Sequence, residues 1–340
     1  FIAFSIGGEF RISNIKQIGT SSITITFFQA CLATLLVDAA LLACGFPAPL
    51  SLTLGAIAAA TAPAATLMVV RQYHAKGEVT STLLPVVAMD DAVGLMLFSI
   101  SLAISQALAS NATLTVTSML LQPLLEIVLS LAVGAGIGLL IALAMRFFHS
   151  KVNRISVAVA AVLLGSALAS IWNLSSLLLC MAIGAVLVNL RKDADELLEI
   201  TDAWTPPLFM LFFVLSGAEL DLAVVPTVGL LGVVYMVARS LGKYFGSFLG
   251  ATIVKSSPNI RKYLGLTLLP QAGVAIGMAQ VALNALPEYG AQIQAVVLTA
   301  TLIYELIGPV ITKLALTAAG EIQDSKKSKA KTEQSAGGAK

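Results

Sequence analysis

Long apolar stretches dominate the chain, and they recur at the length of a membrane-spanning helix. About 20 consecutive apolar residues are enough for a helix to cross a bilayer. A first apolar stretch ends near Gly7, and others follow it along the whole chain. They cover residues 19–44, 50–70, 80–108, 115–148, 155–172, 175–190, 206–215, 227–254, 263–284 and 290–316. The pattern predicts an all-α polytopic membrane protein with about eleven spans.

Composition supports this prediction and excludes several classes of protein. Of the 340 residues, 58% are hydrophobic and 11% are charged, and the mean hydropathy is +0.93. Soluble domains carry about 25% charged residues. The chain is therefore not a soluble globular enzyme, a disordered protein or a nucleic-acid binder. It contains no nucleotide-binding loop, zinc-ligand spacing or nucleophile–base pair, so we predict neither an enzyme nor a cofactor.

The basic residues predict how the chain is oriented. With two exceptions, every Lys and Arg lies in one set of alternate loops or near the C-terminus. These residues are Arg11, Lys16, Arg71, Lys76, Arg146, Lys151, Arg154, Arg191, Lys192, Lys255, Arg261, Lys262, Lys313, Lys326, Lys327, Lys329, Lys331 and Lys340. Because basic loops mark the cytoplasmic side, we predict a multi-pass protein of the cytoplasmic (inner) membrane with a cytoplasmic C-terminus.

The two exceptions are Arg239 and Lys243, which lie one helical turn apart inside the 227–254 span. The 80–108 span contains the adjacent acids Asp90 and Asp91 and no basic residue. A carboxylate at the bilayer centre costs at least about 2.5 kcal/mol. We therefore predict that one aspartate pairs with one of the two cations, both of which can face the carboxylates. Neighbouring helical residues point about 100° apart, so the second aspartate is left to bind a proton or a monovalent cation.

A short repeat indicates two antiparallel halves. The motif Gly-Gly-Glu-Phe at 7–10 returns as Gly-Ala-Glu-Leu at 217–220 on the opposite side of the membrane. In each half a later span is interrupted at its centre, by Thr61–Ala64 in the first and by Pro270–Gly273 in the second. Proline and glycine weaken helix interiors. We predict an inverted-topology repeat with two crossed, unwound helices, whose C-terminal ends offer carbonyl groups to a cation.

Other acids carry less information. Glu305 lies deep in the 290–316 span, where it either supports the site or forms a helix-packing hydrogen bond. Asp38 and Glu126 lie nearer the outer ends of their spans, and reaching the interface is enough to explain them.

These residues together resemble the monovalent cation/proton antiporter superfamily, most closely its Kef/NapA-type branch. The motifs are Thr61-Ala-Pro-Ala, Val87-Ala-Met-Asp-Asp-Ala-Val-Gly94, Arg239-Ser-Leu-Gly-Lys243 and Leu268-Leu-Pro-Gln-Ala-Gly-Val-Ala-Ile-Gly277. The resemblance implies thirteen spans, of which the first two precede Phe1. It also implies a homodimer with a six-helix ion-transporting core, a separate dimerisation domain and an elevator-like movement.

The resemblance also implies roles for single residues. Asp91 is expected to bind the cation and the proton, and Asp90 to pair with a basic residue, Lys243 or Arg239. Thr61 is expected beside the site. The unwound crossing is expected at Ala62, Pro63, Ala64, Pro270, Gln271 and Gly273. Glu305 is a candidate supporting residue.

The same resemblance divides the chain into segments. Residues 1–18 are a partial span of the dimerisation domain, 19–108 and 227–316 are the two halves of the core, and 109–154 form a linking helix. Residues 155–226 complete the dimerisation or scaffold domain, and 317–340 form a disordered cytoplasmic tail.

The function that we predict is exchange of Na⁺ for H⁺ across the lipid bilayer. Potassium-efflux members of the superfamily that the chain resembles tend to have Gln-Asp in place of Asp-Asp and a cytosolic nucleotide-binding domain. The resemblance therefore implies that the Asp-Asp pair and the short tail favour sodium (or lithium) over regulated potassium efflux. A K⁺/H⁺ antiporter of the same fold stays open, as do a sodium-coupled organic-anion symporter and a gated cation channel. The aspartate pair argues against the symporter, and the inverted broken helices argue against the channel.

Overall fold

The computed structural model describes residues 1–8, 10–109, 122–148, 150–172, 174–191, 193–218 and 229–322. Helices form nearly all of this part of the chain, and it contains no strand. The glutamates of the two repeat motifs, at positions 9 and 219, and tail residues 323–340 lie outside the described residues. The inverted repeat therefore stays a prediction.

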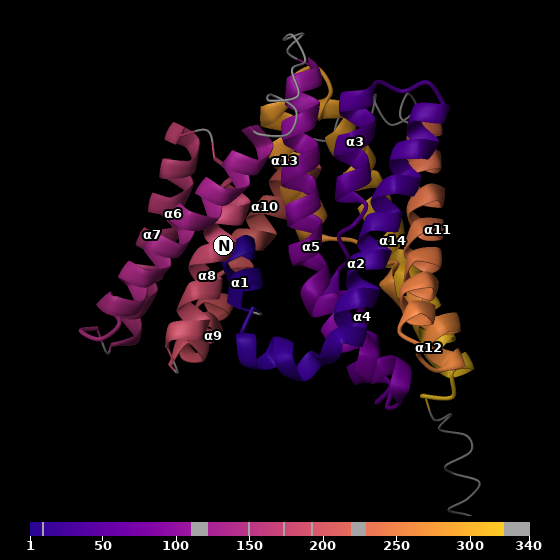
Figure 1. Cartoon of the computed structure of the whole chain (residues 1–340), viewed down its shortest axis with the longest axis horizontal. Helices are drawn as coiled ribbons and strands as arrows, with labels where there is room; N and C mark the ends of the chain where they lie inside the picture. The colour runs from indigo at the N-terminus through magenta and orange to yellow at the C-terminus, as the bar shows by residue number, and fades with distance from the viewer. Residues whose placement is uncertain are drawn as a thin grey trace, which may run out of the picture.

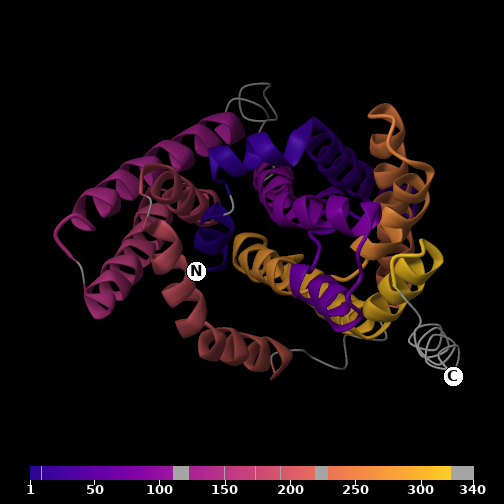
Figure 2. The same cartoon turned by 90° about the horizontal axis from the view of Figure 1, so that it is seen from below.

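The helices form two groups that stand side by side (Figures 1 and 2). We call the first the scaffold group. It consists of α1 (Ile2–Gly8), α6 (Gln122–Ala144), α7 (Lys151–Trp172), α8 (Ser176–Leu190), α9 (Ala194–Trp204) and α10 (Pro206–Ala218). Helix α8 lies at its centre, in contact with α1, α6, α7 and α9. Helix α6, predicted as a separate linking helix, packs along α7 and α8 in this group.

We call the second the broken-helix group. It consists of α2 (Ile12–Ala43), α3 (Ala48–Ile57), α4 (Pro63–Gln72), α5 (Glu78–Ala109), α11 (Gly229–Ile253), α12 (Pro258–Tyr263), the 3₁₀-helix η2 (Leu264–Leu268), α13 (Gly273–Ala285) and α14 (Gly290–Ala318). The two groups meet where α5 contacts α1, α6 and α8.

Five of the described helices are long and apolar enough to cross a membrane, or up to six if the bent pair Pro258–Leu268 and Gly273–Ala285 counts as one span. Other predicted spans correspond to shorter helices, such as α3, α8 and α10. The count of about eleven spans therefore stays a prediction.

Small residues allow α11 to lie directly against α2. A Cβ atom on Gly242, Gly246 or Gly250 would come within 2.5, 2.6 or 2.8 Å of a Cα atom of α2, at Ala33, Gln29 or Ile25 respectively. Glycines four residues apart line one face of a helix and permit such an approach. The close contact buries the middle of α11, and with it Arg239 and Lys243, against the centre of the group.

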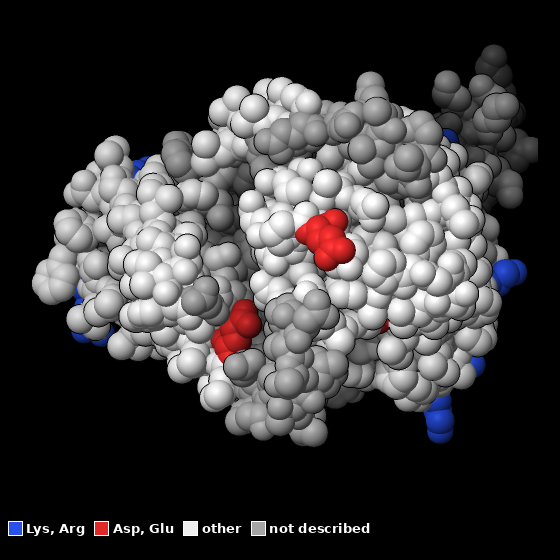
Figure 3. All heavy atoms as spheres, turned by 90° about the horizontal axis from the view of Figure 1, so that it is seen from above, with Lys and Arg blue, Asp and Glu red and all other residues white. Residues whose placement is uncertain are grey.

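Apart from Arg239 and Lys243, the described Lys and Arg residues lie near the end where α2, α5 and α7 begin and α4, α8 and α14 end; we call it the basic end. Figure 3 looks onto the opposite end, where acidic side chains are visible and the blue basic ones show only at the rim. At the basic end Arg154 binds Asp193 and Glu196, each at 2.7 Å, which holds α9 to α7. A hydrogen bond from Arg191 lowers the pKa of Asp193.

The end of α14 is tied to the start of α5 by Glu321. Its carboxylate accepts hydrogen bonds from the backbone of Val79 (2.6 Å) and Thr80 (2.8 Å) and from the Thr80 hydroxyl (2.7 Å). The side chain is buried. Glu321, which the sequence assigned to the predicted tail from residue 317, is thus part of the packed structure.

Replacing Glu321 with alanine is expected to cost about 1–2 kcal/mol, because two backbone donors in the first turn of α5 lose their acceptor. The measurement is the thermal unfolding temperature of the detergent-purified protein. Glu78→Ala is the matched control, since it removes an exposed acid from the same turn of α5. Equal melting temperatures for the Glu321 variant and the wild type would contradict this role.

Candidate ion-binding site

Two interrupted helices touch at the centre of the broken-helix group. The first break separates α3, which ends at Ile57, from α4, which begins at Pro63. The second separates η2, which ends at Leu268, from α13, which begins at Gly273. The backbone N–H of Ala62 donates to the carbonyl of Pro270 at 2.9 Å. The two non-helical stretches therefore contact each other directly. Of the residues predicted to be unwound, Ala62, Pro270 and Gln271 lie in the breaks, whereas Pro63, Ala64 and Gly273 are already helical, because they form the starts of α4 and α13.

Arg239 binds the backbone of both breaks. Its guanidinium donates to the carbonyls of Ala58 (3.1 Å), Ala60 (2.7 Å) and Leu269 (2.7 Å), with a longer contact to Pro270 (3.5 Å). The side chain is fully buried, and the guanidinium lies 4.4 Å from the ring centroid of Tyr304. A planar, five-donor guanidinium suits several acceptors at once. Arg239 thus contacts carbonyl groups and forms no ion pair with Asp90.

Lys243 and Asp90 form a buried ion pair. Lys243 Nζ lies 2.8 Å from Asp90 Oδ2, and both side chains are inaccessible to solvent. The same ammonium donates to the Thr61 hydroxyl at 2.8 Å and to the carbonyl of Ala59. Asp90 also accepts from Thr61 at Oδ2 and from Gln29 at Oδ1. Both carboxylate oxygens of Asp90 are therefore occupied.

Asp91 has a different environment from its neighbour. The side chain is buried, yet Oδ1 has no hydrogen-bond partner in the part of the chain that the structure describes. A buried carboxylate oxygen without a partner is costly unless it binds a proton or a cation. Of the two adjacent aspartates, Asp91 is the one with an oxygen available to an ion.

The sequence led us to expect that carbonyl groups at the breaks are available to an incoming cation. In the structure, several of these carbonyls already accept hydrogen bonds from side chains. The carbonyls that directly follow α3 and η2, from Ala58 to Ala60 and at Leu269, accept hydrogen bonds from Arg239 or Lys243. Side-chain cations favour the negative ends of helices. Formally, two cations and two carboxylates balance at the site, and of the two carboxylates Asp91 is the one with an unpartnered oxygen among the described residues.

Most of the other predicted residues lie at the crossing, and one does not. Gln271 is buried and donates to the carbonyl of Ile57 (3.1 Å) and to the Tyr235 hydroxyl (2.9 Å). Pro63 begins α4, although its side chain and that of Ala64 are outside the described residues. Glu305 is on the exposed face of α14 and does not join the cluster.

Three side chains that sequence reasoning did not single out complete the site. Gln29 binds Asp90, Tyr235 binds Gln271, and Tyr304 covers Arg239. Tyr304 also donates to the carbonyl of Met236 at 2.7 Å. A glutamine inside the apolar 19–44 stretch was a signal for a buried polar contact, because an amide in a span needs a partner.

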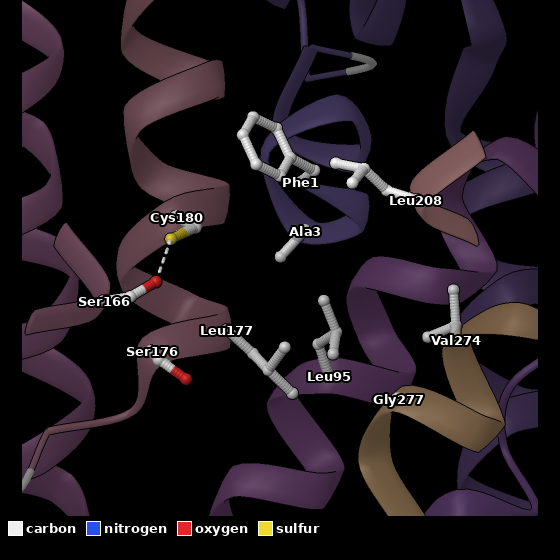
Figure 4. Close-up of a pocket in the computed structure, with 10 residues that line it drawn as sticks. All are labelled: Phe1, Ala3, Leu95, Ser166, Ser176, Leu177, Cys180, Leu208, Val274 and Gly277. Carbon is white, nitrogen blue, oxygen red and sulfur yellow. Dashed lines mark hydrogen bonds between the residues drawn. The ribbon is translucent and has the colours of Figure 1, made fainter. Parts of the chain in front are cut away.

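A cavity of about 270 Å³ lies along the boundary between the two groups, on the Asp91 face of α5 (Figure 4). Leu95, one turn beyond Asp91, points into it from α5, and Val274 and Gly277 line it from α13. Ala3 of α1 and Leu177 and Cys180 of α8 line it from the scaffold group. The cavity begins one helical turn from Asp91 and is bordered by both groups.

Comparisons with known proteins identify the family and the fold. The sequence model of the family described as "Sodium/hydrogen exchanger, transmembrane" matches residues 1–318. A structure of the sodium proton antiporter MjNhaP1 from Methanocaldococcus jannaschii at pH 8 is similar with a TM-score of 0.67 and 21% identity, over 93% of this chain and 84% of that one. An electron-microscopy structure of MjNhaP1 has a TM-score of 0.69 and 19% identity, over 95% and 84% of the two chains.

At such identities these structures establish the fold alone. No curated protein has a sequence significantly similar to the chain. The family match establishes more than the fold, because it extends over nearly the whole sequence. The matched residues include both breaks, the aspartate pair and the two buried basic residues. The chain therefore belongs to the sodium/hydrogen exchanger family of multi-pass membrane antiporters.

Proposed function

We propose that this protein exchanges sodium for protons and that Asp91 is the group that binds either ion. The observation that carries the proposal is the contrast between the two adjacent aspartates. Asp90 has both oxygens occupied, by Lys243, Thr61 and Gln29. Asp91 is buried and has an unpartnered oxygen within the described chain. Asp91 therefore has an oxygen that can bind an ion, whereas both oxygens of Asp90 already have partners.

Competition for one carboxylate converts binding into exchange. A proton and a sodium ion each neutralise Asp91, and neither can bind while the other is present. An empty site leaves a buried carboxylate without compensation, which is the least favourable state. The site therefore crosses the membrane loaded with one ion or the other, and two gradients become coupled.

An elevator-like movement of the broken-helix group past the scaffold group is the proposed means of access. In support, α5 contacts α1, α6 and α8 along the boundary between the groups, and a cavity follows that boundary. A polar contact also crosses it, since the hydroxyls of Ser99 on α5 and Ser175 before α8 lie 3.1 Å apart. Sliding of the groups would break this contact and leave the Lys243–Asp90 ion pair intact, because both of these residues belong to the broken-helix group.

The scaffold group is the proposed dimerisation surface, in a homodimer in the cytoplasmic membrane with a cytoplasmic C-terminus. Large apolar side chains are exposed along α6 and α7, including Leu139, Leu140, Leu143, Leu163 and Leu164. They suit contact with lipid or with a second copy of the chain. The cytoplasmic placement of the basic end rests on the positions of its Lys and Arg residues.

Reconstitution in proteoliposomes tests this function. A pH gradient is imposed, and the fluxes of Na⁺, Li⁺ and K⁺ are measured separately. Sodium-dependent dissipation of the gradient is the expected result. Dissipation by K⁺ alone would favour a potassium/proton antiporter of the same fold. Uptake of an organic anion with sodium, without proton movement, would indicate a symporter and contradict the proposal.

The identity of the residue that pairs with Asp90 predicts how much net charge crosses the membrane in each transport cycle. Lys243 contacts Asp90 directly, and a desolvated ammonium can release its proton. We therefore expect a cation that binds Asp91 to displace one proton from Asp91 and a second from Lys243, so that two protons exchange for one cation. Transport should then respond to an imposed membrane potential. Lys243→Gln should abolish that response. Potential-independent exchange by the wild type, unchanged by this substitution, would contradict a role for the lysine proton.

A further inference from the structure

A second cavity, more polar than the first, lies between the two groups toward the end opposite the basic end. Its volume is about 270 Å³. Helices α5 and α13 border it on one side, and α6, α7 and the start of α8 on the other. Its polar side chains are Ser99, Gln106, Glu126, Ser170, Ser175 and Ser176. Among the described residues that line it there is neither a lysine nor an arginine.

The polar cavity is aligned with Asp91 along α5. Leu95, Ser99, Leu102 and Gln106 follow Asp91 at 4, 8, 11 and 15 residues, which places them on one face of the helix. With a rise of about 1.5 Å per residue, the cavity lies about 10–22 Å from Asp91 along the helix axis. It shares Ser176 and Leu177 with the first cavity, which reaches Leu95. The two cavities thus form a series between that end of the molecule and Asp91.

Glu126 is the one acidic side chain that lines the polar cavity. It belongs to α6 and is half-buried. No ion pair involves it within the described residues, whereas the acids of α9 at the basic end pair with Arg154 and Arg11. A carboxylate that serves only to reach the interface would not need to face an enclosed polar space. Glu126 is therefore an acidic side chain without an ion-pair partner among the described residues, and it lines the cavity that lies farther from Asp91.

We propose that Glu126 attracts monovalent cations into the polar cavity and so sets the apparent affinity for the cation on that side of the membrane. The inference rests on the proposed exchange at Asp91 and adds a residue that acts before the ion reaches it. Low-dielectric walls lined by one sign of charge concentrate counter-ions. Glu126 is on the scaffold group, whereas Asp91 is on the other group, so its influence is limited to the side on which the polar cavity opens.

The test measures exchange as a function of Na⁺ concentration on each side in turn, in proteoliposomes with the full chain in one orientation. Glu126→Gln is expected to raise KM about two- to fivefold on the polar-cavity side, with an unchanged maximal rate and an unchanged KM on the basic side. Glu126→Asp should retain the wild-type KM. Glu288→Gln is the control, because Glu288 is an exposed acid in the turn between α13 and α14, outside the cavity.

Ionic strength gives a second readout that needs no variant. In the wild type, an impermeant salt should raise KM more on the polar-cavity side than on the basic side, because screening weakens the attraction. An unchanged KM in Glu126→Gln, or an equal rise on both sides, would overturn the inference while wild-type exchange still supports the proposed function. Absence of exchange by the wild type would instead refute the proposed function itself.

Discussion

Replacing Asp91 with asparagine is expected to reduce exchange to about one hundredth or less of the wild-type rate. The amide keeps the shape of the carboxylate and removes the negative charge. A charged side chain that binds the ion contributes about 3 kcal/mol to the binding free energy, which corresponds to roughly a hundredfold in affinity for the ion. An amide also cannot carry the proton that is exchanged. The measurement is sodium-driven proton flux in proteoliposomes, with the amount of folded protein determined by size-exclusion chromatography.

Asp90→Asn is the matched comparison, because it makes the same change one position away. Asp90 accepts from Lys243, Thr61 and Gln29, so its loss is expected to lower thermal stability by leaving a buried ammonium without its counter-charge. The Asp90 variant should therefore lose stability, whereas the Asp91 variant should lose transport. Wild-type flux in Asp91→Asn would contradict the assignment of the ion-binding group.

The positions of the helix breaks could be predicted from the sequence because proline acts locally. Pro63 and Pro270 each lack a backbone donor and clash with the preceding turn, and α4 begins at Pro63 while α13 begins three residues after Pro270. The contact between the two breaks could not be derived in this way, since it depends on how distant helices pack. For this contact the sequence offered only an indirect argument, namely that repeat motifs place the two breaks at matching positions of two antiparallel halves.

The rotation of each helix about its axis was the main feature that the sequence left open. Arg239 and Lys243 lie one turn apart, so both could be expected to face the aspartates, yet only Lys243 contacts Asp90. On α14, Tyr304 is buried, whereas its neighbour Glu305 is exposed. When a helix is apolar on all sides, hydrophobic periodicity cannot indicate which face is buried.

The glycine spacing on α11 was a usable signal for its packing face. Gly242, Gly246 and Gly250 recur every four residues and contact α2 closely. Lys243 follows the first of these glycines, and this placement brings its ammonium to the boundary between α2, α3 and α5, where Asp90 and Thr61 lie. The same pattern gives no information about Gln29, whose partner is 61 positions away in the sequence.

Replacing Arg239 with methionine is expected to destabilise the protein by about 3–5 kcal/mol, the range seen when one partner of a buried charged network is removed. Methionine fills a similar volume but leaves the carbonyls of Ala58, Ala60 and Leu269 without their donor. These carbonyls come from both breaks, so the contact between the two unwound stretches weakens together with the hydrogen bonds. The thermal unfolding temperature in detergent should fall well below that of the wild type.

Arg239→Lys separates charge from geometry in the same experiment. Lysine keeps the positive charge, but its single ammonium cannot reach acceptors on two separate backbone stretches as the planar guanidinium does. The lysine variant should therefore also melt early, although less so than the methionine variant because the formal charge balance of the site is retained. If both variants melt with the wild type, Arg239 does not hold the crossing together, and the contact between Ala62 and Pro270 must persist through packing alone.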